Sequence, residues 1–289
     1  MQNLGVTSEF INADGVKLHV AKAGKGPAVV LLHGFPEFWY SWRYQIPALV
    51  EAGFSVFAPD QRGYNLSDKP AGRDAYHLVN LIDDVAHLVG QSGLKRIHLV
   101  AHDWGGIVAW GFAHRYPELL DKLIILNAPH VAIHREKSKQ PPQMFRSWYI
   151  GFFCLPRIPE WVLSAGNYAA IREMFTDKVA RKNAFSPEDI EKYVEAISRP
   201  GALAAALNWY RSGVLTSGGL KLAVEAHTDA PTLVIWGEKD PALDISLLDG
   251  LERYATNLTI HRIPDVSHWV QNEAPDEVNR VMIKFLRGD

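Results

Sequence analysis

The chain contains 289 residues with a formal net charge of −2, and 47% of these residues are hydrophobic. This composition supports a packed globular core, and the near-neutral charge disfavours nucleic acid as a partner because nucleic-acid binders carry clustered basic residues. The single cysteine, Cys154, excludes an internal disulfide and a cysteine-built zinc site. The first residues lack the basic start and apolar run of a secretion signal, and no run of about 18 apolar residues occurs. We therefore expect a cytoplasmic protein with no membrane partner.

The first predicted element is a β-hairpin over residues 9–22, with Ala13, Asp14 and Gly15 in its turn. Short apolar runs rich in β-branched residues then recur, and helical patterns separate several of them. Such runs are typical of strands buried on both faces of a parallel sheet. The alternation predicts a doubly wound, mostly parallel α/β sheet. The predicted strands cover residues 28–32, 54–58, 97–101, 123–126, 232–236 and 259–263, and the clearest helices cover 81–89, 105–114 and 276–286.

The alternation stops between residues 131 and 215, where aromatic residues crowd together. Within this stretch Ser186, Pro187 and Asp189 form a helix start with an N-cap, a first-turn proline and an acidic third residue. An insertion at this point of the chain suits a lid over the carboxyl ends of the strands, where ligands bind in open α/β sheets. We therefore predict a helical cap at 131–215, between a first core part at 1–130 and a second at 216–289.

Residues 99–106 read Leu-Val-Ala-His-Asp-Trp-Gly-Gly and run from an apolar strand into a sharp turn with Asp103 at its tip. Ala101 and Gly105 stand two places to either side, a spacing that lets a strand pivot into a helix at a nucleophile elbow. A carboxylate at this tip must attack carbon directly and leave an ester on the enzyme. Asp103 is therefore the predicted nucleophile.

Cleavage of such an ester by water requires a general base and an acid that orients the base. His268 follows the last predicted strand and Asp240 follows the strand at 232–236, which gives the order nucleophile, acid, histidine. An alternative acid position after the strand at 123–126 holds Asn127, which cannot carry the charge. Glu238 and Asp244 are less favoured substitutes for the acid because they lie at other phases of the loop.

Backbone N–H groups beside the nucleophile form the predicted oxyanion hole, because donors fixed in advance stabilise developing charge best. The amide of Trp104 follows the nucleophile directly, and the amide of Phe35 lies in the His-Gly-Phe-Pro loop after the strand at 28–32. His33 and His102 are expected to buttress the two turns. Glu37 is a candidate for holding the hydrolytic water or the base, although a loop carboxylate is more often simply solvated.

Four segments carry a wider resemblance, and they read His33-Gly34-Phe35-Pro36-Glu37, Gly63-Tyr64-Asn65-Leu66-Ser67, Ala101-His102-Asp103-Trp104-Gly105-Gly106 and Leu207-Asn208-Trp209-Tyr210-Arg211. On these segments the chain resembles epoxide hydrolases of the α/β-hydrolase fold over nearly its whole length. Members of that family place two lid tyrosines over the nucleophile, and the matching positions are Tyr210 and Tyr149. The resemblance implies that both phenols donate to the oxygen of a small apolar epoxide, with water as the second substrate.

The same resemblance implies detoxification as a role and a reaction that uses neither an organic cofactor nor a metal. Aromatic side chains are expected to wall an apolar pocket for the substrate. The predicted substrate-binding residues are Phe35, Trp39, Trp104, Trp148 and Trp209.

A haloalkane dehalogenase is the nearest alternative, because it also uses an aspartate nucleophile followed by tryptophan. Dehalogenases typically carry asparagine after the His-Gly pair to complete the halide site, and this chain has Phe35 there. A fluoroacetate dehalogenase would place arginines where Trp104 and Ile107 stand. The tip residue disfavours a serine esterase, and the complete set of nucleophile, acid and base disfavours a receptor or scaffold without turnover. The oligomeric state stays open between monomer and homodimer.

Overall fold

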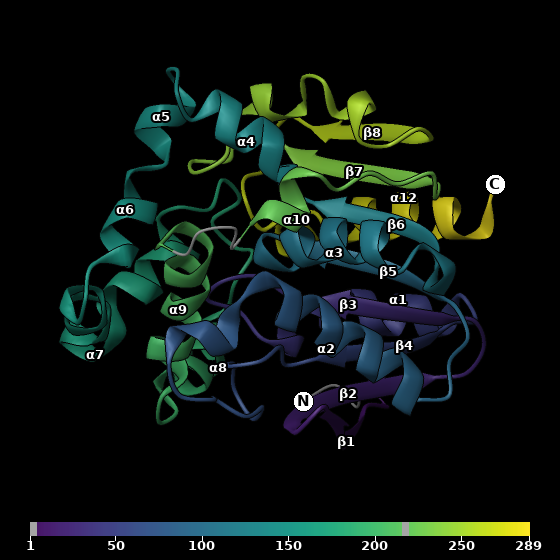
Figure 1. Ribbon diagram of the computed structural model, residues 1–289, viewed down its shortest axis with the longest axis horizontal. Helices are drawn as coiled ribbons and strands as arrows, with labels where there is room; N and C mark the ends of the chain where they lie inside the picture. The colour runs from purple at the N-terminus through teal and green to yellow at the C-terminus, as the bar shows by residue number, and fades with distance from the viewer. Residues whose placement is uncertain (1–4, 216–219) are drawn as a thin grey trace.

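A single eight-stranded sheet organises the computed structural model, which describes residues 5–215 and 220–289 (Figure 1). The strand order is β1-β2-β4-β3-β5-β6-β7-β8, in which β1, β2 and β4 pair antiparallel and all other neighbours pair parallel. Every strand predicted from the sequence overlaps an observed one, so the predicted fold class is confirmed. The strands are β1 (Thr7–Ala13), β2 (Val16–Gly24), β3 (Ala28–Leu32), β4 (Ser55–Pro59), β5 (Ile97–His102), β6 (Leu120–Leu126), β7 (Thr232–Gly237) and β8 (Leu258–Ile263).

Helices cover both faces of the sheet, as its buried central strands require. The helices α2 (Leu78–Gln91) and α3 (Trp104–Arg115) lie on one face, and α1 (Gln45–Glu51) and α12 (Pro275–Arg287) lie on the other (Figure 1). In α12 the buried residues Val278, Met282 and Leu286 recur every fourth position, which aligns them in one apolar stripe. The short helix α11 (Val270–Glu273) leads into α12, and 3₁₀ turns occupy Trp39–Trp42, Arg73–Tyr76, Pro117–Leu119, Ile245–Leu248 and Leu251–Arg253.

Residues 131–215 are all described and form a run of helices between β6 and β7. The predicted start of α8 is confirmed, because the Ser186 hydroxyl accepts from the Asp189 amide at 3.1 Å and the Asp189 carboxylate accepts from the Ser186 amide at 2.9 Å. The helices of this region are α4 (Val131–Lys137), α5 (Gln143–Arg146), α6 (Trp148–Cys154), α7 (Ile158–Thr176), α8 (Pro187–Ser198) and α9 (Ala202–Leu215), with α10 (Lys221–Val224) after it.

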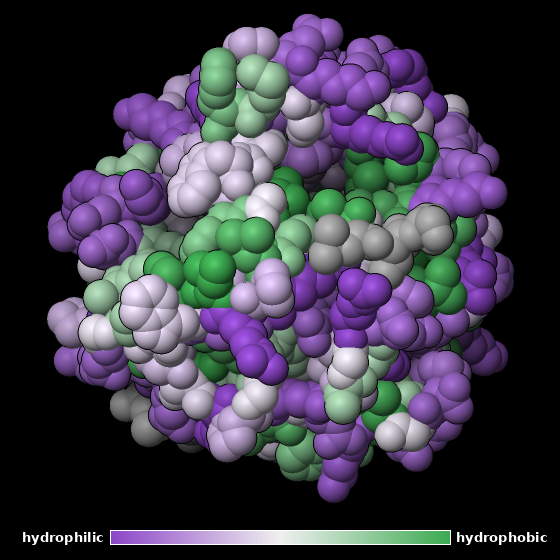
Figure 2. All heavy atoms as spheres, turned by 60° about the vertical axis from the view of Figure 1, so that its left-hand side comes forward, coloured by the Kyte–Doolittle hydropathy of each residue, from purple (hydrophilic) through white to green (hydrophobic). Residues whose placement is uncertain are grey.

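These inserted helices project beyond the carboxyl ends of the parallel strands, at the left of Figure 1. Figure 2 turns that side forward, and green and near-white side chains run across the left and centre of the face that it presents. Within residues 5–215 and 220–289, no helix combines the length and the apolar character needed to cross a bilayer.

Candidate active site

The turn between β5 and α3 holds Asp103 in a strained backbone conformation. Its φ of 51° lies in the left-handed region that L residues rarely adopt. Two glycines make room for this turn: a Cβ on Gly105 would stand 2.5 Å from the Leu32 carbonyl oxygen, and one on Gly34 would stand 2.6 Å from Asp103 Oδ1. The elbow and the loop after β3 therefore interlock, and only a residue without a side chain fits at either contact.

The two carboxylate oxygens of Asp103 face different partners. Oδ1 accepts a hydrogen bond from the Phe35 amide at 2.8 Å, whereas Oδ2 lies 3.6 Å from His268 Nε2. Burial by itself raises the pKa of Asp103, but the facing His268, followed by His102 and the Phe35 amide, outweighs burial and lowers it. Asp103 is therefore held in its ionised form, with one oxygen fixed by the backbone and the other directed at the histidine.

His268 and Asp240 form a buried pair behind the nucleophile, with Nδ1 of the histidine 2.7 Å from Oδ2 of the aspartate. Asp240 Oδ1 accepts from the amides of Ala242 and Leu243 at 2.8 and 2.9 Å, and Oδ2 accepts from the Asn127 side chain at 2.8 Å. Asn127 thus stands at the alternative acid position named above, and its side chain donates to Asp240, the acid in the loop after β7. All four donors favour the carboxylate over the protonated acid.

The charges around His268 set its protonation. Burial alone lowers the pKa of His268, but the carboxylates of Asp240 and Asp103 more than offset burial and raise it well above its usual range. The two substitutes considered for the acid lie elsewhere. Glu238 bonds to Arg262 at 2.7 Å, and Asp244 caps the 3₁₀ turn Ile245–Leu248 through the Ser246 amide.

The phenols of Tyr210 on α9 and Tyr149 on α6 line the same pocket as Asp103 and Trp104. The two phenol rings stand nearly perpendicular, at 82°, with their centroids 6.2 Å apart. Burial raises the pKa of both phenols, and the negative charge of Asp103 raises each further. Both tyrosines therefore keep their protons at neutral pH, facing a carboxylate that has lost its own.

The pocket has a volume of about 830 Å³ and opens between the core and the inserted helices. Apolar residues such as Ile107, Val131 and Leu243 make up much of its wall, and His134 on α4 adds a histidine that desolvation holds neutral, with its pKa lowered to about 4. No group of three or more His, Cys, Asp or Glu side chains suited to a metal ion is found in the described part of the chain.

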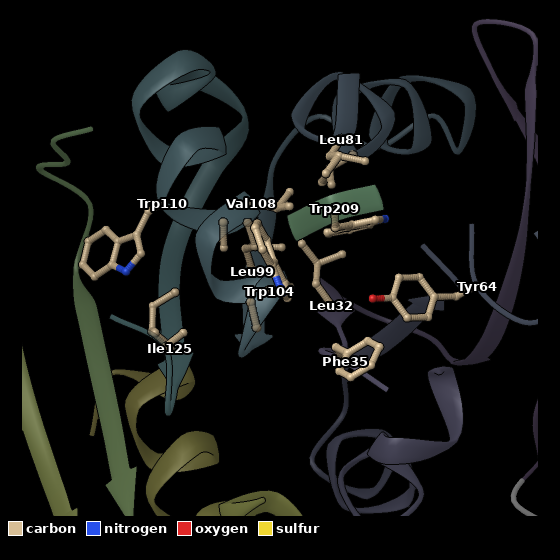
Figure 3. Packing of buried hydrophobic residues seen from close by; sticks show 14 of the residues in the cluster. Leu32, Phe35, Tyr64, Leu81, Leu99, Trp104, Val108, Trp110, Ile125 and Trp209 are labelled. Atoms are coloured by element: carbon tan, nitrogen blue, oxygen red, sulfur yellow. The ribbon is translucent and has the colours of Figure 1, made fainter. Parts of the chain in front are cut away.

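Three of the predicted substrate-binding residues pack at the nucleophile, but of Trp104, Phe35 and Trp209 only Trp104 lines the pocket. Trp104 lines the pocket and packs edge-on against Tyr210 at 5.0 Å between ring centroids. The ring of Phe35 packs on Tyr210 at 5.6 Å. Trp209 is buried beneath them, with its ring 5.9 Å from that of Trp104 and its indole N–H donated to the Arg62 carbonyl at 3.0 Å (Figure 3). Trp209 is thus held as core next to the site and lines no part of the pocket.

The structure does not bring Trp39 and Trp148 to the pocket, contrary to the expectation from sequence. Trp148 turns outward from α6 and is 68% exposed, because the next residue, Tyr149, takes the inward face of this short helix. Trp39 lines a separate groove beside α8, where its backbone amide donates to Asp60 at 3.1 Å. Both residues belong to other parts of the surface.

Glu37 and His102 form a buried pair next to the catalytic residues, with 2.7 Å between Glu37 Oε2 and His102 Nδ1. Glu37 also accepts from the Gly34 amide at 3.0 Å, while His102 Nε2 lies 2.9 Å from the His268 carbonyl oxygen. His33 bridges its own loop to the next one, because Nε2 accepts from the Gln61 amide at 3.0 Å. Both histidines therefore buttress turns as predicted, and Glu37 reaches the base only through His102.

Sequence reasoning missed the contacts that join helix α5 to the loop of Asp240. Gln143 is buried and bonds at once to the Ser147 hydroxyl, the Ala242 carbonyl and the Asp244 amide, at 2.8 to 3.0 Å. Arg146 donates to the Asp240 carbonyl at 2.6 Å. The helix that leads into Tyr149 is thereby tied to the loop that holds the acid. Nothing local in the sequence marks this link, because its partners are about 100 residues apart.

Comparison with known proteins agrees with this architecture. The model of the alpha/beta hydrolase fold family matches residues 27–275. The AB hydrolase superfamily protein YfhM of Bacillus subtilis is 43% identical, over 98% of this chain and 99% of its own. Epoxide hydrolase 4 of Mus musculus is 38% identical, over 96% of this chain and 79% of its own. The crystal structure of Bacillus megaterium epoxide hydrolase in complex with an inhibitor has a TM-score of 0.89 at 33% identity, covering 96% of this chain and all of that one.

The chain therefore belongs to the α/β-hydrolase fold family. Within that family its similarity extends to proteins named epoxide hydrolases over nearly the full chain, so the resemblance stated from the sequence is confirmed.

Proposed function

We propose that this protein hydrolyses epoxides to vicinal diols through a covalent ester on Asp103. One observation carries the proposal, namely that a carboxylate and two protonated phenols, those of Tyr149 and Tyr210, line one pocket. Opening an epoxide leaves an alkoxide, which is a poor leaving group unless an acid donates to it as the ring opens. The similarity to proteins named epoxide hydrolases supports the same reading.

In the first step Asp103 Oδ2 attacks an epoxide carbon, since Oδ1 is already engaged by the Phe35 amide. The bond from that carbon to the ring oxygen breaks, and its electron pair stays on the oxygen. Tyr210 or Tyr149 donates a proton to that oxygen as its charge develops. The product of this step is a hydroxyalkyl ester whose carbonyl oxygen is Oδ1.

In the second step His268 takes a proton from water, and the resulting hydroxide attacks Cγ of Asp103. The charge that forms on Oδ1 is stabilised by the amide of Phe35, which is already bound to that oxygen, and by the amide of Trp104. The bond from Cγ to the substrate-bound Oδ2 then breaks while the His268 imidazolium returns its proton to that oxygen, so the diol leaves with Oδ2. The Asp103 carboxyl, which now holds an oxygen from water, gives its remaining proton to His268, and the resting carboxylate and imidazolium are restored.

The charge balance of the site explains how one histidine serves both steps. In the resting enzyme the carboxylates of Asp240 and Asp103 raise the pKa of His268. Esterification removes the charge of Asp103, so the pKa of His268 falls and its proton passes to the phenolate that the first step leaves. The neutral imidazole can then accept a proton from water. The base is thus released only after the ester has formed.

We further propose the domain division expected from the sequence, with residues 131–215 acting as the cap over a core made of 1–130 and 216–289. The nucleophile, the base and the acid belong to the core, while both phenols come from α6 and α9. The cap must therefore close on the core to bring the two proton-donating phenols opposite the nucleophile.

Dehalogenation by the same nucleophile is less well supported. Residue 35, where a dehalogenase carries an amide, presents a phenyl ring packed on Tyr210 and Phe153. The test is incubation of the purified protein with a styrene-oxide-type epoxide and, separately, with a haloalkane, followed by assays for diol and halide. Diol release that is lost in Asp103→Ala supports the proposal. Halide release alone, or no turnover of either compound, would refute it.

A further inference from the structure

The outer surface of the inserted helices is unusually apolar for an exposed face. Between residues 141 and 165, Phe145 and Trp148 are each 68% exposed and Trp161 is 75% exposed. Together with four smaller apolar side chains they form a surface that we call the cap face, on the side of the molecule that Figure 2 brings forward. The cap face comprises Met144, Phe145, Trp148, Leu155, Ile158, Trp161 and Val162 with the exposed prolines 141, 142 and 156. Contiguous exposed apolar surface of this kind marks an interaction site.

The unpaired charges on the cap face are of one sign. Lys139 and Arg157 are exposed, and neither forms an ion pair within residues 5–215 and 220–289. The only acidic residue from 139 to 165, all of which the structure describes, is Glu160, and its carboxylate is bound by Arg211 at 2.7 and 2.9 Å. The cap face therefore offers apolar and aromatic side chains with unpaired positive charge and no free negative charge.

The cap face also adjoins the mouth of the active-site pocket. Trp148 sits between Ser147 and Tyr149, and both of these residues line that pocket, as do Ile150 and Gly151 on the next turn of α6. A surface that docks onto the cap face thus lies against the helix that forms one wall of the pocket.

We propose that the cap face binds the surface of an anionic lipid bilayer, with its tryptophans and phenylalanine in the headgroup region. Exposed Trp, Phe, Leu and Ile combined with Lys or Arg is the composition of segments that lie in a membrane interface without spanning it. This proposal departs from the expectation of no membrane partner, which rested on the absence of a run of about 18 apolar residues, because contact with a bilayer surface requires no such run. Binding to lipid does not depend on the proposed function.

A second copy of this chain fits the cap face less well. Two-fold pairing sets the same patch of each copy against the other. That arrangement would bring the unpaired Lys139 and Arg157 of both copies together, with no free carboxylate on the face to neutralise them. An anionic lipid surface is complementary to the same charges.

The test is co-sedimentation of the full chain with vesicles of phosphatidylcholine containing phosphatidylglycerol, and with vesicles of phosphatidylcholine alone. We expect binding to the anionic vesicles, with a blue shift of tryptophan fluorescence. The variant Phe145→Ser with Trp161→Ser should lower the partition coefficient about tenfold or more, because it removes two interfacial aromatics. The variant Lys139→Glu with Arg157→Glu should lower it about tenfold on anionic vesicles only.

Phe10→Ser is the matched control, because Phe10 is an exposed aromatic on β1 outside the cap face. It should bind as the parent chain does, and thermal unfolding of every variant checks that the fold persists. Three outcomes would overturn the proposal: no sedimentation with anionic vesicles, equal binding to neutral and anionic vesicles, or retained binding in the folded Phe145→Ser, Trp161→Ser variant. A dimer in analytical ultracentrifugation that this variant abolishes would assign the cap face to a second copy.

Discussion

Replacing the two pocket phenols, separately and together, tests whether they donate the proton to the epoxide oxygen while Asp103 attacks the epoxide carbon. Tyr149 and Tyr210 line the same pocket with their ring centroids 6.2 Å apart, and in the proposed scheme both hydroxyls donate to one developing alkoxide. A hydrogen bond to a charged group contributes about 1.5–3 kcal/mol, which corresponds to about 10- to 150-fold in rate. We expect Tyr149→Phe and Tyr210→Phe each to slow ester formation by about this factor. The double variant should lose about 10²- to 10⁴-fold, the range of general-acid catalysis.

Rapid-quench single-turnover measurements separate ester formation from ester breakdown. Breakdown depends on His268 and Asp240, which the substitutions leave in place, so its rate should stay within about twofold while formation falls. Tyr64→Phe is a suitable control: Tyr64 is a fully buried phenol that does not line the pocket, and its hydroxyl has no hydrogen-bond partner among the described residues. A double variant that forms the ester at the parent rate would refute the reasoning. Slowed breakdown with unchanged formation would do so as well.

Three further predictions concern the base, its protonation and the hydrogen bond that holds the acid Asp240. His268→Gln should form the ester and fail to hydrolyse it, so intact-protein mass spectrometry should find the mass of the epoxide added, and an unshifted mass would contradict the scheme. As the pH falls below neutrality, ester formation should persist because the lowered pKa of Asp103 keeps it ionised, whereas breakdown should slow because His268, whose pKa falls when the ester removes the charge of Asp103, regains a proton; equal slowing of both steps in rapid-quench experiments would count against this. Asn127→Ala removes the 2.8 Å hydrogen bond to buried Asp240 and should cost about 1–3 kcal/mol of stability in urea unfolding, and an unchanged midpoint and slope would contradict that estimate.

The core of the fold was predictable because its signals are local. Each central strand is a short apolar run rich in β-branched residues, and each is followed by a loop at the same edge of the sheet. The positions of Asp103 and Asp240 after two such strands, and of His268 after the parallel edge strand β8, were therefore enough to bring them to one edge. The capping box at Ser186 was equally predictable from the sequence, since all its partners lie within four residues.

The inserted helices were less predictable because orientation decides the role of each aromatic residue there. Trp148 and Tyr149 are neighbours in sequence, yet one faces solvent and the other faces the nucleophile. An aromatic-rich sequence does not reveal which face of a short helix turns inward. The bonds of Gln143 and the path from Glu37 through His102 to His268 join distant segments, and no spacing rule anticipates them.

The hydrogen bond between the Phe35 amide and Asp103 Oδ1 has a consequence for selectivity. Asp103 Oδ1 itself occupies the position where the Phe35 amide could bind an anion, so this donor is engaged before any substrate binds. An ester or amide entering the pocket therefore finds the Phe35 amide already engaged and unable to bind its own carbonyl oxygen. We therefore expect carboxylic ester cleavage, which serine hydrolases with the same elbow carry out, to be slow in this chain.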